Sequence, residues 1–482
     1  MSTLTIILTL ASYVVLLFVV AWRVSRRIPE SSFFTGGRTT PRLVAAIAMV
    51  GAAMSGVTYI SVPGTVQMDS FSYLQTTLGF IVGYIVIAYL LIPIYYKLGV
   101  VSLYEYLDHR FDIVAHRTGA WFFFLSKSLA ASLRAYVICV VLQGLLFERY
   151  GIPFVVNATL MMTLVWLYTR RGGVKSVVWV EMLKSIIMVC SILFAVVYII
   201  RTLDMSAVEA ASVIADSRYS QIFFFDDILD RRYFWKQFIA GIFLVVAMTG
   251  LDQDMMQTVL SCRNRRDAQR SMMHSIAIQV VVIALFLCLG ALLYIYADSR
   301  NIVVERGDDL FGYVATSCGL PTVVGVLFLL GLVASTYSSA GSALTALTTS
   351  FTLDIMRGSR NLDEAHLTRR RRGVHLFVTL LMLLLILVFE HWSTAGVITL
   401  IFTMASYTYG PLLGLFAFGL MSKRVVRSSA VPLISIAAPV MCYILASHSE
   451  VWLGGYNFSY EILILNGALT MLGLYIFSRP KK

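Results

Sequence analysis

Long apolar runs recur along almost the whole of this 482-residue chain, and they restrict its fold more than any other feature. A helix needs roughly 20 apolar residues to cross the hydrocarbon core of a membrane. The chain is 59% hydrophobic and only 13% charged, which leaves little of the charged surface that a soluble domain carries. The sequence therefore predicts an all-α polytopic membrane protein with about thirteen transmembrane helices. The expected spans are 4–22, 42–64, 72–97, 116–147, 153–170, 175–202, 233–259, 270–297, 321–355, 373–390, 394–421, 427–446 and 459–477.

The basic residues are unevenly distributed between the expected loops. If the N-terminus lies outside, 27 of the 38 Lys and Arg residues fall in inner loops and 6 in outer loops. An excess of Lys and Arg marks the cytoplasmic side of a membrane protein. The pattern predicts a multi-pass protein of the plasma membrane, specifically a bacterial inner membrane, with its C-terminus in the cytoplasm. The net charge of +12 is thus an orientation signal, and nucleic acid is not an expected partner.

Two of the expected spans are interrupted. Small residues, including Gly51 and Gly56, and Pro63 interrupt the span 42–64, and the span 233–259 contains Gly241, Gly250 and two acids. Discontinuous helices at matching positions of two halves indicate the binding site of a transporter. The two spans are five apart, so two consecutive five-helix units would have opposite topology. The alternative is that the small residues only allow the helices to pack closely.

Several motifs, taken in order, resemble those of the sodium/solute symporters, which include sodium-coupled sugar, proline and sialic-acid transporters. The strings are FFTGGR (33–38), SLYEYLDHRF (102–111), GGVKSVVWVE (172–181), TGLDQDMMQ (249–257) and STYSSAGSALTALTTSFTLDI (335–355). The resemblance runs from about residue 5 to residue 421, with a local likeness to the sialic-acid branch. It implies a LeuT-type fold and coupling to Na⁺.

The resemblance also implies how the spans are grouped. The first five-helix repeat would occupy 41–202, and an outer loop with the second repeat would occupy 203–421. A leading helix and the first cytoplasmic loop would precede this core in 1–40, and two trailing helices would follow it in 422–482.

Three hydroxyl side chains mark a candidate cation site on the ninth expected span. Ser335, Ser338 and Ser339 are spaced i, i+3 and i+4, which places them on one helix face. Na⁺ prefers oxygen ligands, although the same spacing also suits hydrogen bonds between helices. The resemblance implies that these serines form the principal Na⁺ site together with the backbone carbonyls of Gly51 and Met54.

A second cation position is altered in this chain. Some members of the family have a second Na⁺ site with an Asp early in the sixth span, where this chain has Glu181. Gly341 replaces one expected hydroxyl, and Ser342 remains. Lys184 lies three residues after Glu181, so its ammonium could pair with the carboxylate in place of a second cation. We therefore expect one coupled Na⁺; the alternative is that Lys184 extends to the inner interface.

The resemblance implies that the solute binds beside the broken helices, and it assigns five residues to that site. Ser55 and Thr58 match a Ser and a Thr that contact the solute, and Gln75 and Thr77 match a polar position on the next helix. Arg134 matches an Arg that binds the solute carboxylate. An Arg within a span is a functional candidate in its own right, because its planar fork can bind a carboxylate through two hydrogen bonds. The alternative is a structural partner for a backbone carbonyl or an acid.

Other charges accompany these candidates. Lys127 lies seven residues before Arg134, and the two are expected to make an electropositive lane that favours an anionic solute. Asp252, Gln253 and Asp254 are expected to cap and gate the inner end of the seventh span rather than to contact the solute; the alternative is a packing role.

These observations predict a secondary active transporter and not an enzyme. We expect Na⁺-driven symport, by alternating access, of a small polar, carboxylate-bearing solute such as sialic acid or another sugar or sugar acid. No ATP-binding P-loop and no nucleophile elbow occurs in the sequence. The alternatives are a proton-coupled or uncoupled carrier, or a transporter-like sensor, on the same fold. The expected partners are the small-molecule substrate and the lipid bilayer, and no obligate protein partner is evident.

Overall fold

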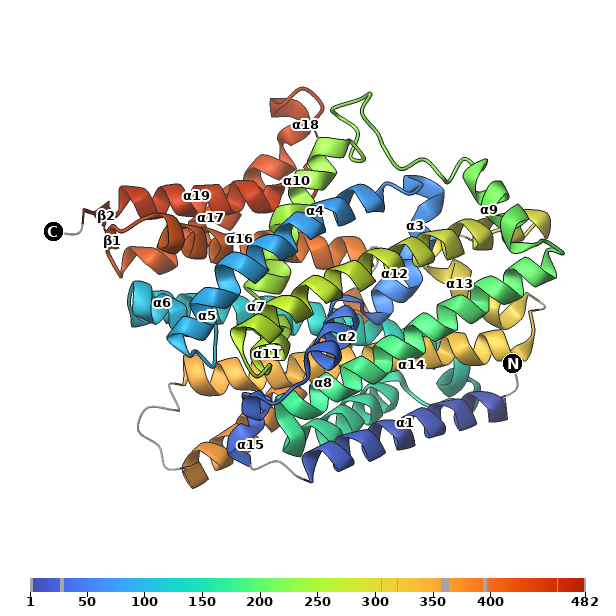
Figure 1. Ribbon diagram of the computed structural model, residues 1–482, viewed down its shortest axis with the longest axis horizontal. Coiled ribbons are helices and arrows are strands. Elements are labelled where there is room, and N and C mark those ends of the chain that lie inside the picture. Colours follow the sequence, from blue (N-terminus) through green and yellow to red (C-terminus); the bar gives the residue numbers. More distant parts are fainter. Residues whose placement is uncertain are drawn as a thin grey trace.

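The computed structural model describes residues 3–26, 30–304, 306–318, 320–356, 364–392, 397–456 and 458–480. Most of these residues are helical, and many of the longer helices run roughly alongside one another (Figure 1). A short antiparallel pairing joins β1 (Val425–Val426) to β2 (Ser478–Arg479). The helices are α1 Thr3–Ser25, α2 Arg42–Ala53, α3 Gly56–Asp69, α4 Tyr73–Val86, α5 Ile92–Leu98, α6 Glu105–Arg110, α7 Ile113–Leu142, α8 Phe154–Thr202, α9 Ala207–Ala215, α10 Phe234–Val245, α11 Gln253–Leu260, α12 Arg265–Ser299, α13 Gly307–Ser317, α14 Thr322–Ser350, α15 Glu364–Trp392, α16 Val397–Met421, α17 Ala430–Ser447, α18 Ser449–Trp452 and α19 Ile462–Ile476.

The expected spans correspond to helices in the described residues. Eight helices are long and apolar enough to cross a membrane, and two bent helix pairs raise this number to ten. The shorter apolar helix α19 coincides with the last expected span, and α16 coincides with the span 394–421, whose first residues lie outside the described part of the chain. A π-helical segment, Ile87–Leu91, joins α4 to α5 within the third span.

Helix α8 contains two expected spans in one continuous assignment. It has 49 residues, which at 1.5 Å per residue is about 74 Å, far more than the roughly 30 Å hydrocarbon core. Gly173 interrupts it with φ 51° and ψ −143°, a conformation that an L-residue rarely adopts. The helix therefore turns at Gly173, between the expected spans 153–170 and 175–202. Counting it twice brings the total close to the expected thirteen.

The first and last described segments lie at opposite ends of the bundle (Figure 1). An odd number of crossings places the two ends of a chain on opposite sides of a membrane, which agrees with the expected count.

The second span is broken, as predicted, and the break lies between α2 and α3. The two helices meet at an angle of 61°. Met54 has an extended backbone, and the backbone N–H of Ser55 donates to the Thr58 hydroxyl at 3.2 Å, so that a new helix begins at Gly56. Pro63, which the sequence suggested as part of the interruption, instead lies inside α3.

The seventh span is broken at a matching position. α10 continues through the π-helical segment Val246–Gly250, and the next helix, α11, is bent from it by 67°. The Asp252 carboxylate accepts hydrogen bonds from the backbone N–H groups of Asp254 and Met255, so it caps α11. Asp252 thus caps a helix, but at the break rather than at the expected inner end of the span, and it lines the cavity there.

Glycines bring the first broken helix close to its neighbours. A Cβ on Gly51 would lie 2.6 Å from the Glu181 carbonyl oxygen, and a Cβ on Gly56 would lie 2.4 Å from the Thr336 hydroxyl. Close packing and chain interruption, which the sequence presented as alternatives, therefore occur together. The break is thereby positioned directly against α8 and α14.

Candidate functional site

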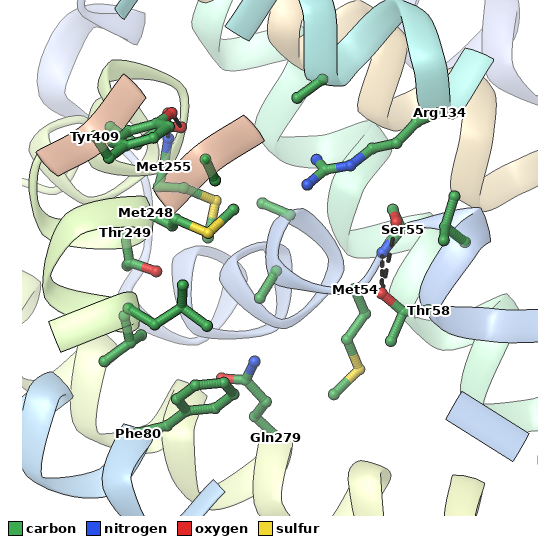
Figure 2. A pocket seen from close by; sticks show the side chains of 18 of the residues that line it. Met54, Ser55, Thr58, Phe80, Arg134, Met248, Thr249, Met255, Gln279 and Tyr409 are labelled. Atoms are coloured by element: carbon green, nitrogen blue, oxygen red, sulfur yellow. Dashed lines mark hydrogen bonds between the residues drawn. The ribbon is translucent and has the colours of Figure 1, made fainter. Parts of the chain in front are cut away.

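A cavity lies beside the two breaks, near the middle of the helices that line it (Figure 2). Its walls come from the α2–α3 break, α4, α7, α10 with the following π-helical segment, α11, α12 and α16. Its empty volume is about 1020 Å³, including the part that opens to solvent. The lining residues are Ala52, Ala53, Met54, Ser55, Val57, Thr58, Tyr73, Phe80, Tyr84, Lys127, Ala130, Arg134, Leu244, Val245, Met248, Thr249, Asp252, Met255, Gln279, Ile283, Ala405 and Tyr409.

Arg134 extends from α7 into this cavity (Figure 2). Its Nε is buried, and its guanidinium has no hydrogen bond to any residue that the structure describes. A buried polar group without a partner carries a desolvation penalty, and the penalty is larger for a charged group. The guanidinium is therefore available to bind an anionic group that enters the cavity.

Two further substrate candidates lie at the break itself. Ser55 and Thr58 both line the cavity, and their hydroxyl oxygens are 3.5 Å apart (Figure 2). Thr58 also accepts the Ser55 backbone N–H, so one of its lone pairs stabilises the start of α3.

The other two substrate candidates have different roles in the structure. The Gln75 side chain donates to the Arg232 carbonyl at 2.8 Å and accepts the Phe224 backbone N–H at 3.2 Å, which ties α4 to the outer loop. The Thr77 hydroxyl donates to the Tyr73 carbonyl one turn earlier. Neither lines the cavity, because α4 presents Tyr73, Phe80 and Tyr84 to it instead.

The prediction of an electropositive lane along the fourth span is wrong, because two carboxylates neutralise the charge of Lys127. Its ammonium lies 3.0 Å from the Asp252 carboxylate and 2.7 Å from the Asp254 carboxylate. All three side chains are buried. Tyr409 on α16 donates to Asp252 at 2.5 Å, so the network joins three helical elements. The isolated charges in spans four and seven were visible in the sequence, but their pairing was not.

Gln279 is a candidate that the sequence analysis missed. It lies on α12, away from Arg134 across the cavity (Figure 2). Its buried Oε1 has no hydrogen-bond partner among the described residues. A lone amide in the apolar span 270–297 was the only available signal.

The predicted Na⁺ ligands come from segments that pack together. The Met54 carbonyl accepts no hydrogen bond from any residue that the structure describes. Ser335 lies against the start of α3, where its hydroxyl is 3.2 Å from the position that a Cβ on Gly56 would take. Ser338, one turn along α14, is buried and faces the Glu181 carboxylate. The structure thus brings potential oxygen ligands from the break and from α14 into one region.

Glu181 and Lys184 form a fully buried ion pair. The Lys184 ammonium lies 2.9 Å from Glu181 Oε2 and donates to the Ser339 hydroxyl at 2.9 Å. Lys184 therefore does not extend to the interface. A Cβ on Gly51 would lie 2.9 Å from Glu181 Oε2, so the pair bridges the broken helix and α14. Ser342, expected near this pair, instead donates to the Asp254 carboxylate.

The buried charges of this region balance. Three cations face three carboxylates around the cavity and the predicted cation site. They are Lys127, Arg134 and Lys184, with Glu181, Asp252 and Asp254. An anion or a cation that entered alone would leave a net charge in a medium of low dielectric constant, which is costly.

The rest of the cavity is mainly apolar. Met54, Met248, Met255 and Phe80 contribute flexible or aromatic surface to its wall (Figure 2). Methionine adapts its shape to irregular ligands. The lining therefore combines one strong anion-binding group and apolar surface with the hydroxyl groups of Ser55, Thr58, Tyr73, Tyr84, Thr249 and Tyr409.

Comparison with known proteins places the chain among membrane transporters. A family model described as the sodium:solute symporter family matches residues 33–434. The human sodium/iodide cotransporter is 25% identical over 399 residues, which cover 80% of this chain and 60% of the relative. The mouse sodium-coupled monocarboxylate transporter 1 is 27% identical over 407 residues, which cover 81% of this chain and 64% of the relative. The chain therefore spans less than two thirds of the length of these animal relatives.

A bacterial relative is covered more fully. The sodium/sialic acid symporter of Proteus mirabilis is 22% identical over 424 residues, which cover 84% of this chain and 82% of the relative. The solved structure of a substrate-bound, outward-open Na⁺-coupled sialic acid symporter superposes with a TM-score of 0.84 at 18% identity, covering 99% of both chains. The structure of a nucleobase-cation-symport-1 family transporter in a closed conformation superposes with a TM-score of 0.52 at 12% sequence identity, covering 92% of both chains. The fold is thus the predicted LeuT-type arrangement of two inverted five-helix repeats.

Proposed function

Because this chain belongs to the sodium:solute symporter family, we propose that it carries a small carboxylate-bearing solute across the membrane together with Na⁺. Na⁺ binds at the oxygens of Gly51, Met54, Ser335, Ser338 and Ser339, and the solute binds in the neighbouring cavity. Alternating access of the cavity to the two sides then releases both inside.

The observation that carries this proposal is the Arg134 guanidinium, which faces the cavity without a hydrogen bond from the described residues. A charged group in the interior of a membrane protein is costly unless it has a partner or a function. A carboxylate would supply two parallel, charge-assisted hydrogen bonds to it. Ser55 and Thr58 lie at the same cavity and would orient the remainder of the solute.

The cavity lining narrows the class of solute. Sialic acid and monocarboxylates, named for two relatives, share a carboxylate. A polyhydroxylated sugar acid needs many hydrogen-bonding partners, whereas Met54, Met248, Met255 and Phe80 offer apolar surface. The same lining carries the hydroxyl groups of Ser55, Thr58, Tyr73, Tyr84, Thr249 and Tyr409, so it favours a carboxylate with both an apolar and a hydrogen-bonding part.

The balanced charges give a physical reason for coupling. A carboxylate that bound alone would leave the region with one excess negative charge, and Na⁺ alone would leave one excess positive charge. Binding both restores neutrality, so each lowers the cost of binding the other, which is reciprocal positive coupling.

Uptake into proteoliposomes tests the proposal. An inward Na⁺ gradient is expected to drive accumulation of one carboxylate from a panel of sialic acid, sugar acids, and alkyl and aryl monocarboxylates. The same gradient of K⁺ is expected to give only equilibration. Accumulation driven equally well by a proton gradient without Na⁺, or no accumulation of any member, would reject Na⁺ symport of a carboxylate.

We expect one Na⁺ per solute, because the buried Lys184 ammonium already neutralises Glu181. One Na⁺ with one monocarboxylate carries no net charge. A potassium diffusion potential across the proteoliposome membrane is therefore expected to leave accumulation unchanged. Two Na⁺ ions would move one net charge, and an inside-negative potential of 100 mV would then favour accumulation by about 2.3 kcal/mol, roughly fiftyfold.

The orientation follows from the distribution of basic residues. We propose that the N-terminus lies outside and the C-terminus in the cytoplasm of a bacterial cell. A fluorescent protein that folds only in the cytoplasm, fused after Lys482, should be fluorescent, and a dark, full-length fusion would contradict this orientation.

A further inference from the structure

A second cleft lies near the start of α12, away from the transport cavity. Its walls come from the start of α2, the π-helical segment Ile87–Leu91 and the first turns of α12. It is lined by Arg42, Tyr89, Arg266, Gln269, Arg270, Met273 and His274. The lining contains three arginines and no acidic residue. This end of the molecule carries the loops predicted to be cytoplasmic.

The basic side chains converge from two separate parts of the chain. Arg266, Arg270 and His274 are spaced i, i+4 and i+8, so they form a stripe along one face of α12. Arg42 is the first residue of α2 and reaches the same cleft. The Gln269 side chain donates to the Ala88 carbonyl at 2.9 Å, which fixes α12 against the π-helical wall.

These arginines differ from several others at this end of the molecule. Arg38 donates to the Gly99 and Val100 carbonyls, and Arg110 donates to the carbonyls of Gly419 and Ser422. Arg371 donates to the Arg170 carbonyl.

Arg42, Arg266 and Arg270 make no hydrogen bond or ion pair with any residue that the structure describes. The neighbouring acid Asp267 accepts from the Asn264 side chain instead. These three exposed guanidinium groups are therefore free of acidic partners among the described residues.

Exposed apolar side chains adjoin the cleft. Leu43, next to Arg42 on α2, is 55% exposed, and on the π-helical wall Tyr89 is 63% and Leu90 47% exposed. In a membrane protein such side chains face lipid, and an aromatic such as Tyr is typical of the headgroup level. The cleft thus combines an unpaired positive cluster with an apolar surface that continues into the bilayer.

We infer that this cleft binds the phosphate headgroup of an anionic phospholipid, whose acyl chains lie along Tyr89, Leu90 and Leu43. Basic pockets between transmembrane helices on the cytoplasmic side suit such headgroups, and guanidinium groups bind phosphate bidentately. α2 carries Gly51, so a headgroup that joins Arg42 to α12 stabilises the inner half of the broken helix. Bound lipid would thereby influence the opening of the transporter toward the inside.

The test compares two variants of the full-length protein in detergent. Arg42→Gln/Arg266→Gln/Arg270→Gln removes the cluster. Arg117→Gln/Arg171→Gln/Arg369→Gln removes three exposed arginines predicted to lie on the same side of the membrane and serves as the matched control. Binding is measured as the shift of melting temperature with added phosphatidylglycerol, phosphatidylcholine or inorganic phosphate, and as co-purified lipid by native mass spectrometry.

Phosphatidylglycerol is expected to stabilise the wild type and the control, and to bind the cluster variant about fivefold more weakly for each arginine removed, roughly a hundredfold in all. Three results would each overturn the inference: no stabilisation of the wild type, equal weakening in the control variant, or equal stabilisation by phosphatidylcholine. If inorganic phosphate alone gives the full shift, the cleft binds a soluble phosphate and the lipid proposal is wrong. These measurements do not depend on transport, so failure of the proposed function would leave them interpretable.

Discussion

Replacing Arg134 by alanine is expected to abolish uptake of the true solute while Na⁺ binding stays measurable. The guanidinium is the one charged group of the cavity wall that no described residue hydrogen-bonds, whereas Lys127 and Asp252 bind each other. Truncating one partner of a buried, hydrogen-bonded charge pair costs about 2–5 kcal/mol. Solute affinity should therefore fall by roughly thirtyfold to several thousandfold.

The conservative variant Arg134→Lys separates geometry from charge. Lysine keeps the positive charge but lacks the planar fork, so it should retain weak uptake with a raised KM. Na⁺ binding to Arg134→Ala, measured by calorimetry without solute, serves as the control for folding. Normal uptake by Arg134→Ala would exclude the carboxylate-binding role. Loss of Na⁺ binding together with uptake would indicate a structural role instead.

Replacing Lys127 by methionine is expected to have the largest effect on stability. The change would leave Asp252 and Asp254 buried beside each other without their shared ammonium. Removing one member of a buried ion pair typically costs 3–5 kcal/mol, because the remaining charge is uncompensated. The melting temperature of the purified variant, or its yield of folded protein, should fall sharply.

A compensated variant shows whether lost charge balance is the cause. Lys127→Met/Asp254→Asn removes one cation and one carboxylate, so that two cations again face two carboxylates, and the Asp252 carboxylate can still cap α11. Its melting temperature should recover most of the loss. Arg231→Met is the exposed counterpart, because Arg231 pairs with Asp69 while 61% of its own side chain is exposed, and it should cost about 0–1 kcal/mol. Equal destabilisation by Arg231→Met, or no recovery in the double variant, would contradict the explanation.

The positions of the spans and of their interruptions could be predicted from the sequence, because both depend on local composition. Apolar length identifies a span, and a run of small residues identifies a segment that can leave helical geometry. The exact position of the break was harder to predict from the sequence. Pro63 is the strongest local helix breaker in that segment, yet the helix continues through it, and the chain breaks at Met54, where Gly51 and Gly56 contact α8 and α14.

The substrate candidates on α4 show that the position of a residue along a helix does not determine whether its side chain faces the cavity. Gln75 and Thr77 were assigned by position along the chain, but the cavity is lined by Tyr73, Phe80 and Tyr84 of the same helix. A rotation of the helix about its axis changes which residues face the cavity without changing their depth. That rotation is set by packing against α10, for example by the contact between Gly79 and the Phe238 carbonyl.

By itself, the sequence determined the class of protein, the broken spans and the serine face of α14, and it offered the pairing of Glu181 with Lys184, three residues apart on one helix, as one of two alternatives. These features depend on composition or on spacing within a single helix. Only the tertiary structure decided that Lys127 belongs to Asp252 and Asp254, that Ser342 binds Asp254, and that Arg134 is the charged group of the described cavity wall without a hydrogen-bond partner. Such pairings join residues more than a hundred positions or several helices apart, and the energy of a buried charge depends on its neighbours in space.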